Sequence, residues 1–359
     1  MTGEAAEADQ AITLDLGRPS SLTPADVVAV PADVAERIRS ARHVLVVCHE
    51  NPEADALGSA LALALAVEWR GGRATPVCAD PVPELYDFMP RIERFRTEPD
   101  PDADYDLIVV TDCGELSRVG PVLATHAGLF GRVPVVNIDH HKSNPGFGIA
   151  NWVDPAAAAA SEMMTLLLAA LGVPLDTADG AIADALMAGL VMDTATFQHP
   201  NVTPRTLRVA AELVAAGAPL ADTSRLLYRT KPDAQLKLFG RVLARLESEL
   251  GGRLVWSTLL LDDLRATGSV PAHSEGIIDL LSQAKAARIE LLFKEQLDET
   301  RLSIRTPQGG PDATELASHW GGGGHARASG ATVPLPLAEA IPAVLSVARA
   351  MLAREEHGA

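Results

Sequence analysis

Residues 133–142 read VPVVNIDHHK and join an apolar run to an acidic residue and two adjacent histidines. The apolar part has the length and the branched side chains of a buried strand. Asp139, His140 and His141 follow at its end, and burying ionisable groups is unfavourable unless they are paired or bind a metal. We therefore interpret this segment as a strand that ends at a metal site, and we expect further ligands elsewhere in the chain.

Three other short apolar runs are bordered by polar residues. They cover residues 44–48, 74–78 and 107–110, and helical patterns such as residues 56–69 separate them. This alternation predicts an α/β fold with a parallel sheet covered by helices on both faces. In such sheets ligands gather beyond the carboxyl ends of the strands. His49 and Asp112 both come just after a predicted strand, which places them at that edge.

The candidate metal ligands share this position near the ends of predicted elements: His49, Glu53, Asp55, Asp112, His140 and Asp193. Four carboxylates and two imidazoles suit a pair of divalent ions, most simply Mn²⁺, with Mg²⁺ or Co²⁺ as substitutes. Two ions about 3.5–4 Å apart can share a carboxylate, bind a phosphoryl oxygen and lower the pKa of a bound water. Each residue alone has an ordinary explanation as a surface residue, cap or turn, so the prediction depends on their joint placement.

The composition excludes several classes of protein. The formal charge of −17, from 47 acidic and 30 basic residues, opposes binding of long nucleic acid such as duplex DNA. Aromatic residues make up only 4%, which argues against a single-strand binder built on stacking. No apolar run approaches the roughly 20 residues of a membrane helix, and we expect no membrane partner. The acidic N-terminus does not resemble a secretory signal.

The three cysteines, Cys48, Cys78 and Cys113, suit a reducing cytoplasm better than a disulfide framework. A zinc site with thiolate ligands is the alternative, because Cys48 and Cys113 flank two candidate ligands. Alternation along a strand turns Cys48 away from the face that His49 uses, and the chain has no C-x-x-C pair. We expect both thiols to be small core residues.

The pattern of elements predicts two domains with a connection between them. Residues 1–30 have no strong period and are expected to form a flexible leader, followed by a first domain over residues 31–200. Residues 201–252 are helical in character and are expected to connect the domains, with Gly251-Gly252 at the boundary. The segment 253–359 has strand candidates and predicts a smaller α/β domain.

A run of four glycines, Gly321 to Gly324, precedes His325 in the second domain. The run has two explanations: a flexible turn, or a backbone that approaches a phosphate or base where any side chain would clash. In the second case His325 donates a hydrogen bond to the anion, and Arg305 and Arg327 are near enough in sequence to add charge-assisted bonds.

With these residues in order, the chain resembles the DHH/DHHA1 family of phosphoesterases, and most closely the stand-alone bacterial nano-RNases. The resemblance covers about residues 41–351 and rests on five motifs. They are HENPEADALGS at 49–59, VTDCG at 110–114, DHH at 139–141 with Asn144, GLVMDT at 189–194 with Phe197, and GGGGH at 321–325, together with Ser303 and Arg305.

The resemblance implies roles for these residues. His49, Glu53 and Asp112 are expected to hold one Mn²⁺, and Asp55, Asp112, His140 and Asp193 the other, with Asp112 shared. His141 is expected to face the scissile phosphate, supported by Asp139. Substrate contacts are expected from Ser303, Arg305, Gly322, Gly323, Gly324 and His325, across a cleft between a DHH catalytic domain and a DHHA1 domain.

Two residues depart from the family pattern. Glu53 stands where aspartate is usual, so its carboxylate lies one methylene further out and leaves metal affinity at that position open. Ala195 replaces the usual glycine after Asp-Thr, with an expected effect on local packing only.

The resemblance implies a Mn²⁺-dependent phosphodiesterase that cleaves short oligoribonucleotides and di-AMP species, such as pApA or cyclic di-AMP, to mononucleotides. Two alternatives stay open: a pAp 3′-phosphatase, since the same site would bind that phosphate, and a nucleotide-binding sensor with weakened catalysis, suggested by Glu53. We expect a cytoplasmic homodimer, because relatives are often dimers.

Overall fold

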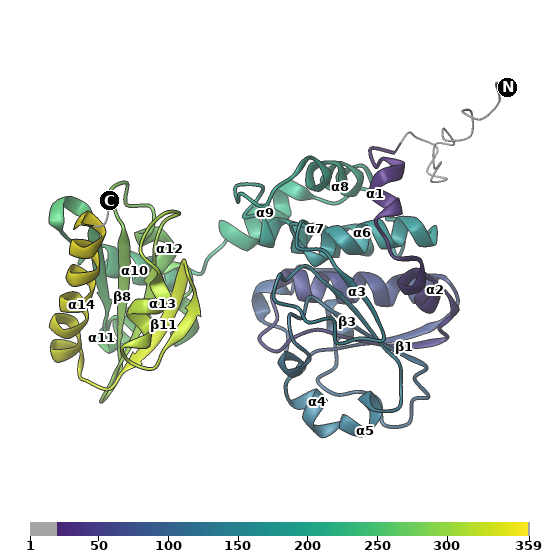
Figure 1. Cartoon of the computed structure of the whole chain (residues 1–359), viewed down its shortest axis with the longest axis horizontal. Coiled ribbons are helices and arrows are strands. Elements are labelled where there is room, and N and C mark those ends of the chain that lie inside the picture. Colours follow the sequence, from purple (N-terminus) through teal and green to yellow (C-terminus); the bar gives the residue numbers. More distant parts are fainter. Residues whose placement is uncertain (1–19, 358–359) are drawn as a thin grey trace. The chain divides into compact units, whose positions relative to one another are not determined.

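The computed structural model describes residues 20–357 and divides the chain into two compact units after Thr230. The first unit therefore contains the predicted catalytic domain, and the second contains the predicted substrate-binding domain (Figure 1). Among the described residues, no helix combines the length and the apolar character needed to cross a membrane.

The first unit is built on a five-stranded parallel sheet with the order β2-β1-β3-β4-β5. Its strands are β1 (His43–Val47), β2 (Arg73–Val77), β3 (Leu107–Thr111), β4 (Val135–Asp139) and β5 (Ala150–Val153). The first four match the apolar runs in the sequence to within about two residues. The edge strand β5 was not predicted, because its four residues give no period of their own.

Helices cover both faces of this sheet, as the α/β prediction required (Figure 1). One face packs on the long helices α3 (Ala54–Trp69), α6 (Ala160–Leu171) and α7 (Ala181–Asp193), with α2 (Ala32–Ser40) in the same core. The other packs on the short helices α4 (Pro121–Thr125) and α5 (Ala127–Phe130) and the 3₁₀ turn η3 (Leu116–Val119). Strand β1 shows the alternation: Val44 and Val46 enter the first core, Leu45 and Val47 the second.

Glycines let helices α3 and α7 approach closely. A Cβ added to Gly58 would lie 2.2 Å from the carbonyl oxygen of Ala185, and one added to Gly189 would lie 2.5 Å from Oδ1 of Asp55. No side chain fits at either position, so the backbones are held together along their crossing. This contact brings the start of α3, with Asp55, next to the end of α7, with Asp193.

The predicted connector over residues 201–252 is wrong as a single element. Helices α8 (Pro204–Ala215) and α9 (Leu220–Tyr228) belong to the first unit, whereas α10 (Asp233–Leu243) belongs to the second. Proline, which cannot donate to a helical ladder, interrupts the pattern at Pro219 and Pro232. The boundary therefore falls inside the stretch that the sequence presented as continuous.

The predicted flexible leader is only partly open to comparison, because residues 1–19 lie outside the described residues. Its described part is structured, since Pro24–Val28 form helix α1. The hydroxyl of Ser21 donates to the carbonyl of Arg208 at 2.8 Å, and the carboxylate of Asp26 accepts from the Arg208 guanidinium at 2.7 Å. These bonds fasten the segment to α8.

The second unit has a six-stranded sheet with the order β10-β11-β9-β8-β7-β6. Its strands are β6 (Glu247–Glu249), β7 (Leu254–Leu259), β8 (Ile289–Glu295), β9 (Thr300–Arg305), β10 (Gly323–His325) and β11 (Ala328–Val333), of which only β7 and β8 pair in parallel. Helices α13 (Ala313–Ser318) and α14 (Leu337–His357) share one core with the sheet. The other face packs on α10, α11 (Leu261–Thr267) and α12 (Ile277–Leu281).

Candidate metal centre and substrate pocket

The candidate metal centre lies at the carboxyl ends of β1, β3 and β4. The strand order of the first sheet reverses direction between β1 and β3, and such a switch point opens a crevice where ligands bind. His49 follows β1, Asp112 follows β3, and Asp139 ends β4. The sheet topology therefore accounts for the meeting of motifs that are far apart in the sequence.

Asp112 occupies the middle of this cluster. It is fully buried, and neither of its carboxylate oxygens accepts a hydrogen bond from the described protein. Its backbone has a φ of +53°, which is uncommon for a residue other than glycine, and its N–H donates to the carbonyl of Ile138 at 3.0 Å. Nε2 of His140 lies 3.3 Å from Oδ1, and Nε2 of His49 lies 3.6 Å from Oδ2.

His49, Glu53 and Asp112 form the first potential ligand group, with one ligand atom of each within 4.8 Å of the others. Nδ1 of His49 lies 2.7 Å from the carbonyl of Glu50, which accepts a hydrogen bond from it and leaves Nε2 facing Asp112. Glu53 is the residue just before α3. Its longer side chain therefore does not prevent it from joining the group.

Asp55, His140 and Asp193 form the second potential ligand group. Nε2 of His140 lies 3.2 Å from Oδ2 of Asp193 and 4.0 Å from Oδ2 of Asp55. The Asp55 carboxylate also accepts the N–H groups of Ala160 at 2.6 Å and Ser161 at 2.8 Å, at the start of α6. These bonds fix the direction of the carboxylate within the core.

The charges in this cluster are strongly coupled. Burial, and then the negative charge of Asp112, raises the pKa of Asp55 to about 7. Burial would likewise raise the pKa of Asp112, but the imidazoles of His140 and His49 outweigh it and hold that pKa below its ordinary value. Burial disfavours a charged His140, yet the surrounding carboxylates raise its pKa to about 10. The cluster thus has an excess of negative charge that protons or metal cations can neutralise.

His141 points to a different partner from its neighbour. Its Nδ1 lies 2.7 Å from Oδ1 of the fully buried Asp139, whose Oδ2 accepts the side-chain amide of Asn144 at 2.6 Å. The carboxylate therefore sets the orientation of the imidazole and leaves Nε2 available for another group. His141 also forms a third potential ligand group with Asp112 and His140.

The donor set fits divalent cations. Buried carboxylate oxygens without donors are costly, and Asp112, which has two, belongs to the first ligand group and lies beside His140 of the second. Carboxylates with imidazoles are ligands of Mn²⁺-like ions. The three cysteines are free and buried, and none belongs to a potential ligand group within residues 20–357.

The glycine run of the second unit is an ordered edge rather than a flexible turn. Gly323–His325 form strand β10, paired with β11. A Cβ at Gly322 would lie 2.2 Å from the carbonyl oxygen of Gly330, and one at Gly324, whose φ is +140°, would lie 2.6 Å from that of Ala328. The hairpin itself therefore requires glycine at these two positions, whereas a Cβ at Gly323 would meet open space.

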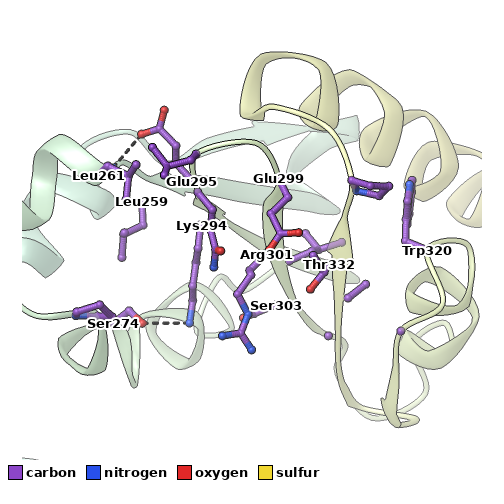
Figure 2. A pocket seen from close by; sticks show the side chains of 18 of the residues that line it. Leu259, Leu261, Ser274, Lys294, Glu295, Glu299, Arg301, Ser303, Trp320 and Thr332 are labelled. Carbon is purple, nitrogen blue, oxygen red and sulfur yellow. Dashed lines mark hydrogen bonds between the residues drawn. The ribbon is translucent and has the colours of Figure 1, made fainter.

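A pocket of about 1290 Å³ lies wholly within the second unit (Figure 2). Ser303 and Gly322, two of the predicted substrate contacts, line it. The others, Arg305, Gly323, Gly324 and His325, are not among its lining residues. Arg305 pairs with Asp279 at 3.2 Å. Arg327 donates to the carbonyls of Pro307 and Gly310, so its bonds are structural.

Sequence reasoning missed two cations in this pocket, Lys294 and Arg301. The available signal was the alternation of Arg301, Ser303 and Arg305 along one strand, which puts three polar side chains on the same face. Lys294 stands near the end of an otherwise apolar strand, which is a second departure from a core pattern.

Comparison with known families agrees with both units. The model of the DHH family N-terminal domain matches residues 43–190, and the model of the DHHA1 domain matches residues 266–354. These ranges contain all the candidate metal ligands except Asp193 and all the predicted substrate contacts.

Individual proteins are similar over most of the chain. A bifunctional oligoribonuclease and PAP phosphatase NrnA of Thermus thermophilus is 34% identical over 87% of this chain and 90% of its own length. One of Bacillus subtilis with the same description is 32% identical over 55% of this chain and 62% of its own. An exopolyphosphatase-related protein of Bacteroides fragilis shares the fold, with a TM-score of 0.79 at 21% identity over 91% of this chain and 97% of that one.

Proposed function

We propose that this phosphate-ester hydrolase cleaves short oligoribonucleotides and di-AMP species to mononucleotides. The chain belongs to the DHH family and carries its DHHA1 domain. The observation that carries the proposal is the buried Asp112 carboxylate, which belongs to one group of potential metal ligands and contacts His140 of another. A short substrate also suits a chain with a formal charge of −17, which disfavours long nucleic acid.

We propose that two divalent ions, most simply Mn²⁺, act in this site. His49, Glu53 and Asp112 would hold one, and Asp55, Asp112, His140 and Asp193 the other. When bound, such ions supply positive charge to a phosphoryl oxygen and lower the pKa of a bound water. Asp55 keeps its direction through the N–H groups of α6, so this ligand needs no rearrangement.

His141 would act on the substrate in this proposal. Asp139 accepts from its Nδ1, so Nε2 is the atom that would hydrogen-bond to the scissile phosphate. In the second unit, Ser303, Arg305, Gly322 to Gly324 and His325 would bind the substrate's nucleotide. The open space beside Gly323 and the exposure of His325 support this part.

The test is a product assay with purified protein, Mn²⁺ and pApA. We expect AMP as the product. Excess chelator should abolish the release of AMP, and added metal should restore it. A folded protein that binds Mn²⁺ and releases no AMP from pApA, cyclic di-AMP or RNA of two to five nucleotides would contradict the proposal.

Phosphatase action on pAp is the second candidate, and the descriptions of the two NrnA relatives favour it. Both reactions would place a phosphate in the same site. The ratio of kcat/KM for pAp to that for pApA, measured on one preparation, decides which is the main activity.

A sensor with weakened catalysis is the remaining alternative, and Glu53 suggested it. The Glu53 carboxylate reaches the ligand group of His49 and Asp112, which favours a working enzyme. We therefore expect Glu53→Asp to change kcat for pApA by less than about threefold, since the ligand type is unchanged. A much larger rise in kcat would support the sensor.

The proposal includes a cytoplasmic homodimer. Three free, buried cysteines suit a reducing compartment. Light scattering of the purified protein measures the mass directly, and a single species near the chain mass of 37.7 kDa would reject the dimer.

A further inference from the structure

Strand register places two cations opposite each other in the pocket of the second unit. Lys294 of β8 pairs with Arg301 of β9 in the antiparallel ladder, so both side chains emerge on the same face. Ser303 lies one step along that face. Figure 2 shows the Lys294 and Arg301 side chains directed into the same space, with Ser274 and Ser303 close by.

Neither cation of this pair forms an ion pair with a carboxylate of the described residues. Lys294 donates to the hydroxyl of Ser274 at 3.1 Å, and the side chain of Arg301 forms no ion pair or hydrogen bond with another residue of the described chain. Like charges at directly opposed positions are destabilising. Burial lowers the pKa of Lys294; Glu275 opposes that shift, and the charges of Arg301 and Arg305 add to it. An anion between the two side chains would relieve this repulsion.

Four carboxylates line the pocket as well, those of Glu275, Glu295, Asp298 and Glu299, and none of them forms an ion pair with Lys294 or Arg301. Glu295 accepts the N–H of Leu261 at 2.8 Å and so serves helix α11. Asp298 and Glu299 lie in the turn between β8 and β9, where Asp298 is exposed and Glu299 is partly buried. These turn carboxylates can accept hydrogen bonds from sugar hydroxyls, and Trp320 and Leu264 give the pocket apolar surface. A nucleotide combines all three kinds of group.

The pair is separate from the predicted contact at Arg305. Arg301 and Arg305 are four residues apart, which is roughly 13 Å along a strand. Asp279 holds Arg305 at 3.2 Å, and Arg305 does not line the pocket. The two arginines therefore have different surroundings, and only Arg301 faces the pocket.

We propose that Lys294 and Arg301 form a subsite for an additional phosphate of an oligoribonucleotide, beyond the cleaved phosphate and the one bound near Arg305. This inference rests on the proposed function. A substrate with three phosphates, pApApA, uses the subsite, whereas pAp, with two, leaves it empty. The pocket then makes the enzyme prefer trinucleotides.

The test compares Arg301→Gln with Arg301→Lys and with Arg265→Gln, which neutralises an exposed arginine on α11 outside the pocket. We expect Arg301→Gln to lower kcat/KM for pApApA about tenfold, through KM, as for loss of one charge-assisted bond. Activity of Arg301→Gln on pAp should stay within about twofold of the wild type, because pAp has no third phosphate for the subsite. Arg301→Lys restores most of the loss, and Arg265→Gln matches the wild type.

Equilibrium binding of pApApA in a chelator gives a readout that a structural role would not move. Removing one phosphate contact should make log K fall less steeply with log salt, because one fewer charge pair is screened. Equal losses on pAp and pApApA, or an unchanged slope, would overturn the subsite. If the wild type cleaves no oligonucleotide, the proposed function fails, while the binding slopes still decide whether the subsite exists.

Discussion

Asp112 in the first unit and Glu290 in the second are both buried carboxylates with an oxygen that accepts no hydrogen bond from the described chain. Their pKa values shift in opposite directions. Two imidazoles hold the pKa of Asp112 below its ordinary value, whereas burial raises the pKa of Glu290 to about 7. Arg305, opposite Glu290 in the ladder, is paired with Asp279.

The difference shows what makes a buried carboxylate suited to metal binding. Burial alone favours the neutral acid, which is a poor ligand. Burial beside groups that carry or accept positive charge keeps the carboxylate ionised. Of these two carboxylates only Asp112 meets both conditions, because the sheet brings His49 and His140 to it.

The largest effect that tests this contrast is expected for Asp112→Asn. The variant keeps the shape of the side chain and removes the shared charge, so activity on pApA should fall by more than about 10³-fold, beyond the 10–100-fold typical of residues that only support a ligand. Mn²⁺ at 100 times its Kd should stabilise the wild type by about 2.7 kcal/mol, which is measured as a rise in Tm, and it should not raise the Tm of the variant. Asp102→Asn, at an exposed position, should behave as wild type.

We expect the ionisation of Glu290 to affect the stability of the second unit rather than its activity. Its pKa of about 7 in the folded protein lies above the ordinary value of 4.5, so its contribution is fully present below pH 4.5 and is lost as pH rises through 7. The loss is roughly 3 kcal/mol at about 1.4 kcal/mol per pH unit. Denaturation of the second unit at pH 5 and pH 8 measures it. Glu290→Gln should remove this part of the pH dependence, and the exposed Glu339→Gln should retain it.

Asp139→Asn tests the support of His141 within the metal centre. The amide is a weaker acceptor for Nδ1, so we expect a loss of about 10–100-fold in kcat for pApA. Calorimetry should show nearly unchanged Mn²⁺ affinity, because Asp139 belongs to none of the potential ligand groups of the described chain. A large fall in metal affinity with kcat preserved at saturating metal would show that Asp139 acts on the metal instead.

The smallest effect concerns Ala195, which follows the end of α7. Its φ of +46° is a left-handed conformation that costs an alanine roughly 1–2 kcal/mol and a glycine much less. The departure from the family glycine thus affects the backbone, and not only local packing. Ala195→Gly should raise the free energy of unfolding by about 0.5–1 kcal/mol in urea denaturation. Ala211→Gly, on the exposed side of α8, should lower it by a similar amount.

The sequence alone was sufficient for the class of fold and the candidate ligands. Apolar runs marked β1, β3 and β4, and the polar residues after them marked the edge where His49 and Asp112 meet. This works because strand and helix periods are local, and because the carboxyl ends of parallel strands lie at one edge. The family motifs indicate the same candidate residues.

Tertiary structure decided what depends on pairing between distant segments. The sequence contained no sign that Lys294 stands opposite Arg301, because register is set by packing across a whole sheet. It also did not show the end of the first unit at Thr230 or the short strand β5. The ionisation of Asp112 depends on two imidazoles that only the fold brings near, since electrostatic interactions act over ångströms and not over sequence positions.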